Sequence, residues 1–190
     1  MRVAINGMGR IGRLLFRRLV DHPGIELVAV NDIMPVDNLV YLSKYDSIYG
    51  TFGHDMAVEE NFIVVAGKKI RVFQADHPSK LPWKELNIDV VLESSGRFSG
   101  KAGAEEHIKA GAKKVLLSTT GSDEIPLMIY GFNQTSLTPD THIISPGGCM
   151  TNCSVHLLYI LNTIGIQSAQ INILHSYTSR QELVDASHKQ

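Results

Sequence analysis

A cysteine and a histidine in the last quarter of the chain could act together as a nucleophile and a base. Cys149 follows two glycines and precedes a segment, Thr151–Thr163, that we predict to be helical. The N–H groups and the dipole of a helix N-terminus stabilise a thiolate, which is a strong nucleophile. His175 closes a predicted strand, Gln167–His175, and could serve as the base if the two side chains meet. Spacing alone does not show that they meet, and a lone histidine at a strand end is more often structural.

Cys153, one helical turn beyond Cys149, leaves alternatives open. We expect it to be a small core residue. A C-x-x-x-C pattern could also be half of a metal site completed by His175 or another histidine. No second Cys/His pair has the spacing of a zinc site, so we expect no metal. A disulfide within one helical turn is geometrically awkward.

A glycine-rich loop near the N-terminus has the spacing of a dinucleotide-binding turn. Gly7, Gly9 and Gly12 form a G-x-G-x-x-G pattern, with Arg10 and Ile11 between the last two glycines. The pattern alone is weak, but a predicted strand precedes it and a predicted helix follows it. Gly7 would permit a tight turn, Gly9 would let the backbone approach a pyrophosphate, and Gly12 would let the helix pack on the strand.

Asp32 strengthens this interpretation. It lies 20 residues after Gly12, at the end of a second predicted strand, where its carboxylate could accept hydrogen bonds from the hydroxyls of an adenosine ribose. Its charge would repel a 2′-phosphate, so we predict NAD rather than NADP as the cofactor. The alternative is a plain glycine turn with Asp32 on the surface.

The predicted elements alternate between strands and helices, which favours an α/β fold with a mainly parallel sheet covered on both faces. Phe62–Ala66 and Ile70–Phe73 should form a hairpin, and residues 33–61 should be irregular apart from a short helix at Asn38–Tyr45. The other predicted strands are Arg2–Asn6, Glu26–Val30, Asp89–Glu93, Lys114–Ser118, Leu127–Gly131 and His142–Ser145, and the other predicted helices are Arg10–His22 and Lys101–Ala110.

This order of elements predicts a Rossmann-type, doubly wound parallel sheet followed by the beginning of an α+β catalytic domain. We place the domain boundary near residue 148. Residues 1–148 would then form the NAD-binding domain, and residues 149–190 the truncated start of the catalytic domain.

The composition is that of an ordinary globular protein, with 44% hydrophobic and 19% charged residues. The net charge of −1 gives no broad field that would favour nucleic acid, and no apolar run reaches the roughly 18 residues of a membrane span. We therefore expect neither nucleic acid nor a membrane as a partner. The N-terminus lacks the features of a secretory signal, and two cysteines are too few for a disulfide framework, so the cytoplasm is the expected compartment.

Several segments, which follow one another in the family's order along nearly the whole chain, resemble the glyceraldehyde-3-phosphate dehydrogenase family. The glycine loop is similar to the family's opening, and Val30-Asn31-Asp32 is similar to its ribose-binding strand end. Cys149 with Thr151-Asn152-Cys153 resembles the active-site segment, and His175-Ser176-Tyr177-Thr178 resembles the histidine segment. Further similar segments are Pro82-Trp83, Glu93-Ser94-Ser95-Gly96 and Gly111-Ala112-Lys113-Lys114-Val115.

The resemblance implies NAD-dependent oxidation of a phosphorylated aldehyde, similar to glyceraldehyde 3-phosphate, through a thioester on Cys149. The thiolate would attack the aldehyde, hydride would pass to the nicotinamide, and phosphate would release the acyl group, with His175 as the base. The full-length protein would be a homo-oligomer. The resemblance also implies cofactor neighbours at Ser95, Gly96 and Thr119, and a contact to the substrate phosphate at Thr178.

Departures from the family bear on how the thioester would be released. The family usually has Ser before and Thr after the catalytic cysteine, and both hydroxyls commonly contact the attacking phosphate; here these positions hold Gly148 and Met150. Losing two donors to an anion costs about 1.5–3 kcal/mol each. We hypothesise that water or another acceptor releases the thioester, which phosphate-dependent formation of an acyl phosphate would contradict. Arg180 also stands where the family usually has a smaller or acidic residue.

Two alternatives to this function stay open. The chain could be an isolated dinucleotide-binding fragment without activity, because chains of the family continue well beyond the histidine segment. It could also belong to a relative with the same thioester chemistry, such as a semialdehyde or erythrose-4-phosphate dehydrogenase. A semialdehyde reductase would prefer NADP, against which Asp32 argues.

Overall fold

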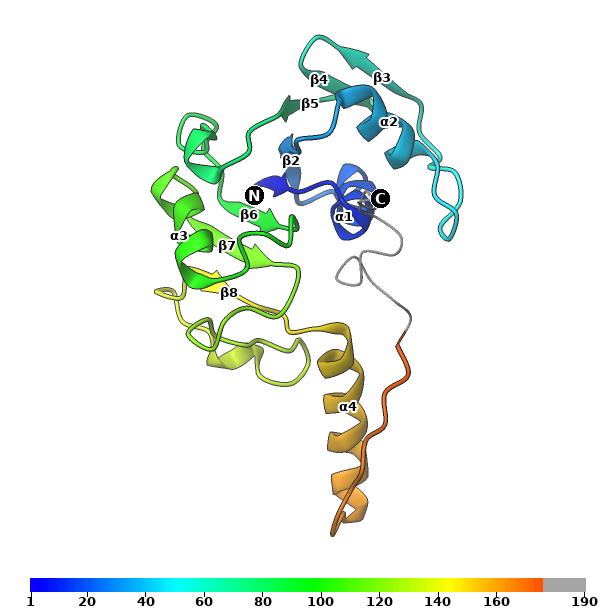
Figure 1. The fold of residues 1–190 in the computed structure, drawn as a ribbon, viewed down its shortest axis with the longest axis vertical. Coiled ribbons are helices and arrows are strands. Elements are labelled where there is room, and N and C mark those ends of the chain that lie inside the picture. Colours follow the sequence, from blue (N-terminus) through cyan, green and yellow to red (C-terminus); the bar gives the residue numbers. More distant parts are fainter. Residues whose placement is uncertain (176–190) are drawn as a thin grey trace, which may run out of the picture. The chain divides into compact units, whose positions relative to one another are not determined.

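A mostly parallel sheet forms the core of the first of two compact units, Met1–Gly148. The computed structural model describes residues 1–175, and within them the sheet has eight strands in the order β3-β4-β5-β2-β1-β6-β7-β8 (Figure 1). Pairing is parallel from β5 to β8 and antiparallel between β3, β4 and β5. The predicted α/β, Rossmann-type fold class is confirmed. The strands are β1 (Arg2–Asn6), β2 (Glu26–Asn31), β3 (Met56–Glu59), β4 (Phe62–Val65), β5 (Lys68–Phe73), β6 (Val90–Glu93), β7 (Lys114–Leu117) and β8 (Ile143–Ile144).

Apolar layers cover both faces of the sheet, because successive side chains of a strand point to opposite sides. On β1, Val3 and Ile5 pack in one cluster with Phe16 of α1, whereas Ala4 between them packs in another cluster with Trp83. Helices α1 and α2 therefore cover one face, and the segment around Trp83 lies on the other. The helices of this unit are α1 (Arg10–Val20), α2 (Val36–Lys44) and α3 (Lys101–Lys109), with short 3-10 turns η1 (Pro78–Lys80) and η2 (Gln134–Ser136).

The strand order changes direction at β1, which lies between β2 and β6. At its carboxyl end, Asn6 pairs in register with Asn31 of β2 and with Glu93 of β6. Ligands of open α/β sheets bind outside the carboxyl ends of the strands at such a switch point. The topology thus brings three polar strand ends to the edge where a ligand is expected.

The predicted strand Leu127–Gly131 is wrong. Leu127 makes only an isolated bridge to Ser145, and the chain then turns. The side chain of Asn133 accepts the N–H of Ile129 at 2.7 Å and donates to the carbonyl of Leu127 at 2.9 Å. A local side chain thereby takes the backbone groups that a strand would offer to a neighbouring strand.

The segment 33–61 is more regular than predicted. Helix α2 begins at Val36, two residues before the expected start, and β3 adds a short strand at Met56–Glu59. This strand pairs only with β4 and has half-buried side chains on one side, so its alternation was too weak and too short to detect in the sequence.

The second unit begins at Cys149 with helix α4 (Cys149–Ile164), which starts two residues before the predicted helix. The predicted strand Gln167–His175 is wrong, because no segment of the described chain pairs with it. None of the helices within residues 1–175 is both long and apolar enough to span a membrane.

Candidate cofactor crevice and active-site cysteine

A crevice of about 240 Å³ opens where β1, β2 and β6 end. Four residues that the sequence predicts as cofactor-binding line it: Gly7, Gly9, Asp32 and Ser95. The rest of the lining consists of Asn6, Asn31, Ile33, Ala75, Asp76, Ser94, Arg97 and Phe98. The other predicted cofactor residues lie outside this lining: Arg10, Ile11 and Gly12 in the first turn of α1, Gly96 in the loop after β6, and Thr119 after β7.

The three glycines of the loop meet different demands. Gly7 has a φ of 92°, and a Cβ there would lie 2.4 Å from the backbone of Ser95. A Cβ on Gly12 would lie 1.9 Å from the carbonyl oxygen of Gly7, so the turn and the helix are in direct backbone contact. A Cβ on Gly9 would meet nothing within 4 Å, although Gly9 lines the crevice. Packing explains Gly7 and Gly12, whereas Gly9 leaves room for a ligand to approach the backbone.

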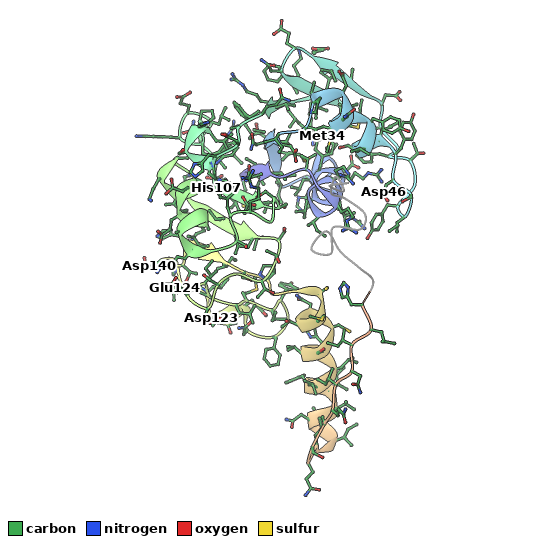
Figure 2. The ribbon with its side chains drawn as sticks, viewed as in Figure 1. Met34, Asp46, His107, Asp123, Glu124 and Asp140 are labelled. Atoms are coloured by element: carbon green, nitrogen blue, oxygen red, sulfur yellow. The ribbon has the colours of Figure 1, made fainter. Side chains whose placement is uncertain are left out.

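Asp32 holds the glycine loop from the end of β2. Its Oδ2 accepts the N–H of Met8 at 2.6 Å, and its Oδ1 accepts the N–H of Met34, a residue labelled in Figure 2, at 2.9 Å. A carboxylate oxygen has two lone pairs, so both oxygens can still accept from a ligand hydroxyl. Asp32 can therefore shape the loop and bind a ribose at the same time.

The residues around the crevice fit a dinucleotide. Helix α1 begins after Gly9 without a side-chain cap, so its dipole and first-turn donors favour an anion there. The Oγ of Ser94, which lines the crevice, is buried and has no hydrogen-bond partner among the described residues. A ligand with polar groups would satisfy that atom, since buried polar groups are normally paired.

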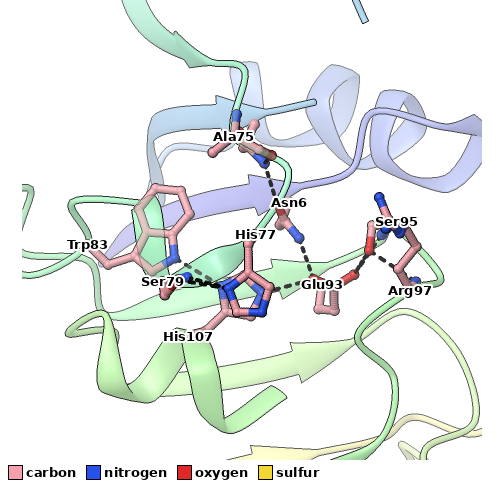
Figure 3. A network of polar contacts seen from close by, with 10 residues as sticks. Asn6, Ala75, His77, Ser79, Trp83, Glu93, Ser95, Arg97 and His107 are labelled. Atoms are coloured by element: carbon pink, nitrogen blue, oxygen red, sulfur yellow. Dashed lines mark hydrogen bonds and ion pairs between the residues drawn. The ribbon is translucent and has the colours of Figure 1, made fainter. Parts of the chain in front are cut away.

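Sequence reasoning missed a cluster of polar residues that is buried beneath the crevice. Asn6, Asn31 and Glu93 are 2%, 4% and 2% exposed, and Figure 3 shows Asn6 and Glu93 joined with His107 and Trp83 in one hydrogen-bonded network. The available signal was that each of the three ends an apolar strand with a polar residue. Adjacent parallel strands place such residues at the same edge.

The predicted nucleophile and base meet in the second unit. Cys149 is the first residue of α4, and its Sγ lies 3.2 Å from Nε2 of His175. The hydrogen bond with the His175 side chain is the main reason that the pKa of the Cys149 thiol lies below its ordinary value. Desolvation is the next-largest influence and opposes this shift, whereas the charge of His175 and the backbone N–H groups of Met150 and Cys149 lower the pKa further. The arrangement favours a thiolate that is also exposed to reagents.

Two further sequence predictions concern this unit. The expectation that Cys153 is a core residue is wrong, because it is exposed and α4 has no buried residue. Thr178, the predicted contact to a substrate phosphate, lies outside the described residues. Across residues 1–175, no group of three or more His, Cys, Asp and Glu side chains is arranged to hold a metal ion.

Comparison with known proteins bears on both units. Residues 1–101 match the family model of the glyceraldehyde 3-phosphate dehydrogenase NAD binding domain, and residues 148–190 match the model of the C-terminal domain of that enzyme. The chain is 42% identical to the glyceraldehyde-3-phosphate dehydrogenase of Clostridium pasteurianum over 189 residues, which cover 99% of this chain and 57% of the relative.

Other curated relatives give similar values. The glyceraldehyde-3-phosphate dehydrogenase of Mycoplasma pneumoniae is 42% identical over 190 residues, covering 99% of this chain and 56% of the relative. The enzyme of Geobacillus stearothermophilus is 40% identical over 191 residues, covering 100% of this chain and 57% of the relative. The chain thus spans somewhat more than half the length of these relatives. With an NAD-binding domain at its N-terminus and this identity along its whole length, the chain belongs to the glyceraldehyde-3-phosphate dehydrogenase family.

Proposed function

We propose that this chain supplies the NAD-binding domain, residues 1–148, and the start of the catalytic domain, residues 149–190, of an NAD-dependent dehydrogenase. Its substrate is a phosphorylated aldehyde such as glyceraldehyde 3-phosphate. The observation that carries the proposal is the 3.2 Å contact between Cys149 Sγ and His175 Nε2 at the start of α4. A nucleophile paired with a base at a helix N-terminus suits covalent attack on a carbonyl.

Cys149 and His175 divide the chemistry between them. The Cys149 thiolate adds to the aldehyde carbon and forms a carbon–sulfur bond, and the carbonyl oxygen gains a negative charge. His175 gives that oxygen a proton and takes it back as the carbon is oxidised, so that a thioester remains on Cys149. Bound NAD supplies the hydride acceptor. The lowered pKa of Cys149 keeps the attacking thiolate populated.

The crevice residues bind and orient the cofactor. Gly7, Gly9 and Gly12, with the backbone of Arg10 and Ile11, receive the pyrophosphate at the N-terminus of α1. Asp32 accepts from the adenosine ribose and disfavours the 2′-phosphate of NADP, which supports NAD. The remaining proposed cofactor neighbours are Ser95, Gly96 and Thr119.

Release of the thioester is proposed to use water or another acceptor in place of phosphate. Gly148 and Met150 carry no hydroxyl beside Cys149. Water attacking the thioester carbon would give a carboxylic acid and return the thiol of Cys149. Thr178 is the proposed contact to the phosphate of the substrate. A homo-oligomer in the cytoplasm is the proposed context of the full-length protein.

Calorimetric titration with NAD, followed by reduction assays with glyceraldehyde 3-phosphate in the presence and absence of phosphate, tests the proposal. We expect NAD to bind, and any reduction to require Cys149 and not to accelerate with phosphate. The Cys149→Ser variant is the control, because it should bind NAD normally and reduce none. Reduction that survives Cys149→Ser would contradict the thioester route, and a strong phosphate dependence would contradict release by water.

A second candidate function, a dinucleotide-binding module without activity, is favoured by one observation. The crevice lies wholly within Met1–Gly148, whereas α4, which carries Cys149, has no buried residue. Binding of NAD without any aldehyde-dependent reduction would favour this candidate for the chain of 190 residues.

A further inference from the structure

A line of buried polar side chains crosses the sheet beneath the cofactor crevice. It runs from Asn31 on β2 through Asn6 on β1 to Glu93 on β6 and His107 on α3. His107 is fully buried, and the other three are 2–4% exposed. Such a line is stable only if every donor faces an acceptor, so its hydrogen-bond directions can be derived from its ends.

The first end of the line is the backbone of Ala75. Its N–H can only donate, and it donates to Oδ1 of Asn31 at 2.8 Å. The Asn31 amide is thereby oriented, and its Nδ2 donates to Oδ1 of Asn6 at 2.7 Å and to the carbonyl of Ala75 at 2.9 Å. Nδ2 of Asn6 is left to donate to Oε2 of Glu93 at 2.5 Å. From this side the donors point toward Glu93.

The second end is the indole of Trp83, which can only donate. Its Nε1–H donates to Nδ1 of His107 at 3.0 Å, so Nδ1 carries no proton. Nε2 of His107 therefore carries the proton and donates to Oε2 of Glu93 at 2.9 Å. From this side too the donors point toward Glu93 (Figure 3).

Both directions converge on Glu93, which also accepts the N–H of Ser95 at 2.7 Å and the hydroxyl of Ser95 at 2.5 Å. Four hydrogen bonds reach two oxygens, and the donors come from Asn6, His107 and Ser95. Glu93 is therefore the acceptor at which the hydrogen bonds from both ends of the line meet.

We propose that Glu93 is a positioning residue that holds the β6 side of the dinucleotide crevice through Asn6 and Ser95. Both residues line the crevice, and Gly7 packs directly against the backbone of Ser95, so a shift of Ser95 reaches the glycine loop. The β2 side is held independently, because Asn31 keeps two hydrogen bonds to Ala75 without Asn6. This inference rests on the NAD binding of the proposed function.

The two sides of the crevice take different parts of the ligand. Asp32, next to Asn31, is the proposed contact to the adenosine ribose, so the remainder of the dinucleotide extends past Gly7 toward the loop after β6. AMP needs only the first side, whereas NAD needs both. Glu93 should therefore govern the affinity for NAD and leave the affinity for AMP nearly unchanged.

The test compares NAD and AMP binding to the wild-type chain and to Glu93→Gln. The glutamine side chain has nearly the same shape, but its amide NH2 group is a donor where Glu93 has an oxygen that accepts hydrogen bonds. We expect NAD affinity to fall about tenfold and AMP affinity to change less than about twofold. The emission of Trp83, the only tryptophan, should also change because its partner His107 loses the carboxylate.

A matched control separates positioning from general destabilisation. Ile63 of β4 is fully buried and lies outside the crevice, so Ile63→Ala should lower the unfolding temperature without changing either affinity. If Glu93→Gln does not fold, His107→Leu serves in its place. This variant removes one hydrogen bond to Glu93 and leaves those from Asn6 and Ser95. We therefore expect a smaller loss of NAD affinity, about threefold.

The proposed role of Glu93 would be overturned if Glu93→Gln lost affinity equally for NAD and AMP, or lost affinity for neither. A loss of NAD affinity in Ile63→Ala would overturn it as well, because the effect would then follow stability alone. Failure of the wild-type chain to bind NAD would instead contradict the proposed function itself.

Discussion

The crevice and the Cys149 site are built in opposite ways. The crevice stands on a buried network in which Glu93 alone accepts four hydrogen bonds at 2.5–2.9 Å. Cys149 is exposed, and its Sγ contacts the side chain of His175, which is exposed as well. The proposed cofactor residues are positioned by many contacts from several elements, whereas the proposed nucleophile, Cys149, is positioned by the start of one helix.

This difference shows that cofactor binding and the reactivity of Cys149 depend on the fold to different degrees. Changes in the first unit act on binding through packing and buried hydrogen bonds, so they should alter stability and affinity together. Changes at Cys149 or His175 should alter reactivity and leave stability nearly unchanged, because few contacts are lost. Substitutions in each region can break or sharpen this contrast.

The largest effect is expected for Gly12→Ala. The added methyl group would lie 1.9 Å from the carbonyl oxygen of Gly7, and backbone must move to admit it. We expect the free energy of unfolding to fall by about 3 kcal/mol, measured by urea denaturation, with loss of NAD binding. Gly9→Ala is the matched control, since its methyl meets nothing within 4 Å; it should change stability by less than about 0.5 kcal/mol yet weaken NAD binding. Equal stability of the two variants would contradict this account.

A smaller effect is expected for Asp32→Asn. The variant loses the charge and offers one acceptor oxygen where two now take the N–H groups of Met8 and Met34. We expect NAD affinity to fall about tenfold and the preference for NAD over NADP to narrow, measured by calorimetry with both cofactors. An unchanged preference would show that Asp32 acts only on the loop.

The fold could be predicted from the sequence where local patterns decide it. The glycine spacing, the apolar strand runs and the helical periodicity of residues 10–20 are all local, and the Rossmann-type sheet follows from them. The strands Leu127–Gly131 and Gln167–His175 were wrong because pairing is not local. In one case Asn133 takes the backbone groups, and in the other no described segment offers a partner.

The candidate site shows the same division. The positions of Gly7, Gly9 and Asp32 at the crevice follow from spacing, whereas the network through Glu93 and His107 depends on strand register and on a helix that packs across two strands. A sequence reveals that a strand ends in a polar residue, but not which side chain it will meet. The catalytic and cofactor roles of the site residues stay predictions.

At the Cys149 site, His175→Ala should raise the pKa of the thiol toward its ordinary value, because the contact with His175 is the largest cause that lowers it. The thiolate of the wild-type chain persists at pH values where that of the variant is already protonated. Alkylation by iodoacetamide should therefore slow several-fold at pH 7 and converge with the wild-type rate at high pH. Cys153→Ser is the control and should retain the wild-type profile, and the unfolding temperature should not change. Identical pH profiles for His175→Ala and the wild type would contradict the pairing.

The smallest effect is expected for Gly148→Ser, at the position where the family usually has a serine. A Cβ at 148 would lie 3.1 Å from Oγ1 of Thr120, so that side chain must move by a few tenths of an ångström. We expect the free energy of unfolding to fall by no more than about 1 kcal/mol, and the double variant with Thr120→Ala to recover the loss. A loss well above this in Gly148→Ser, unrelieved by Thr120→Ala, would mean that the backbone requires glycine. If the serine is accepted, packing does not explain Gly148, and its missing hydroxyl points to the chemistry of thioester release.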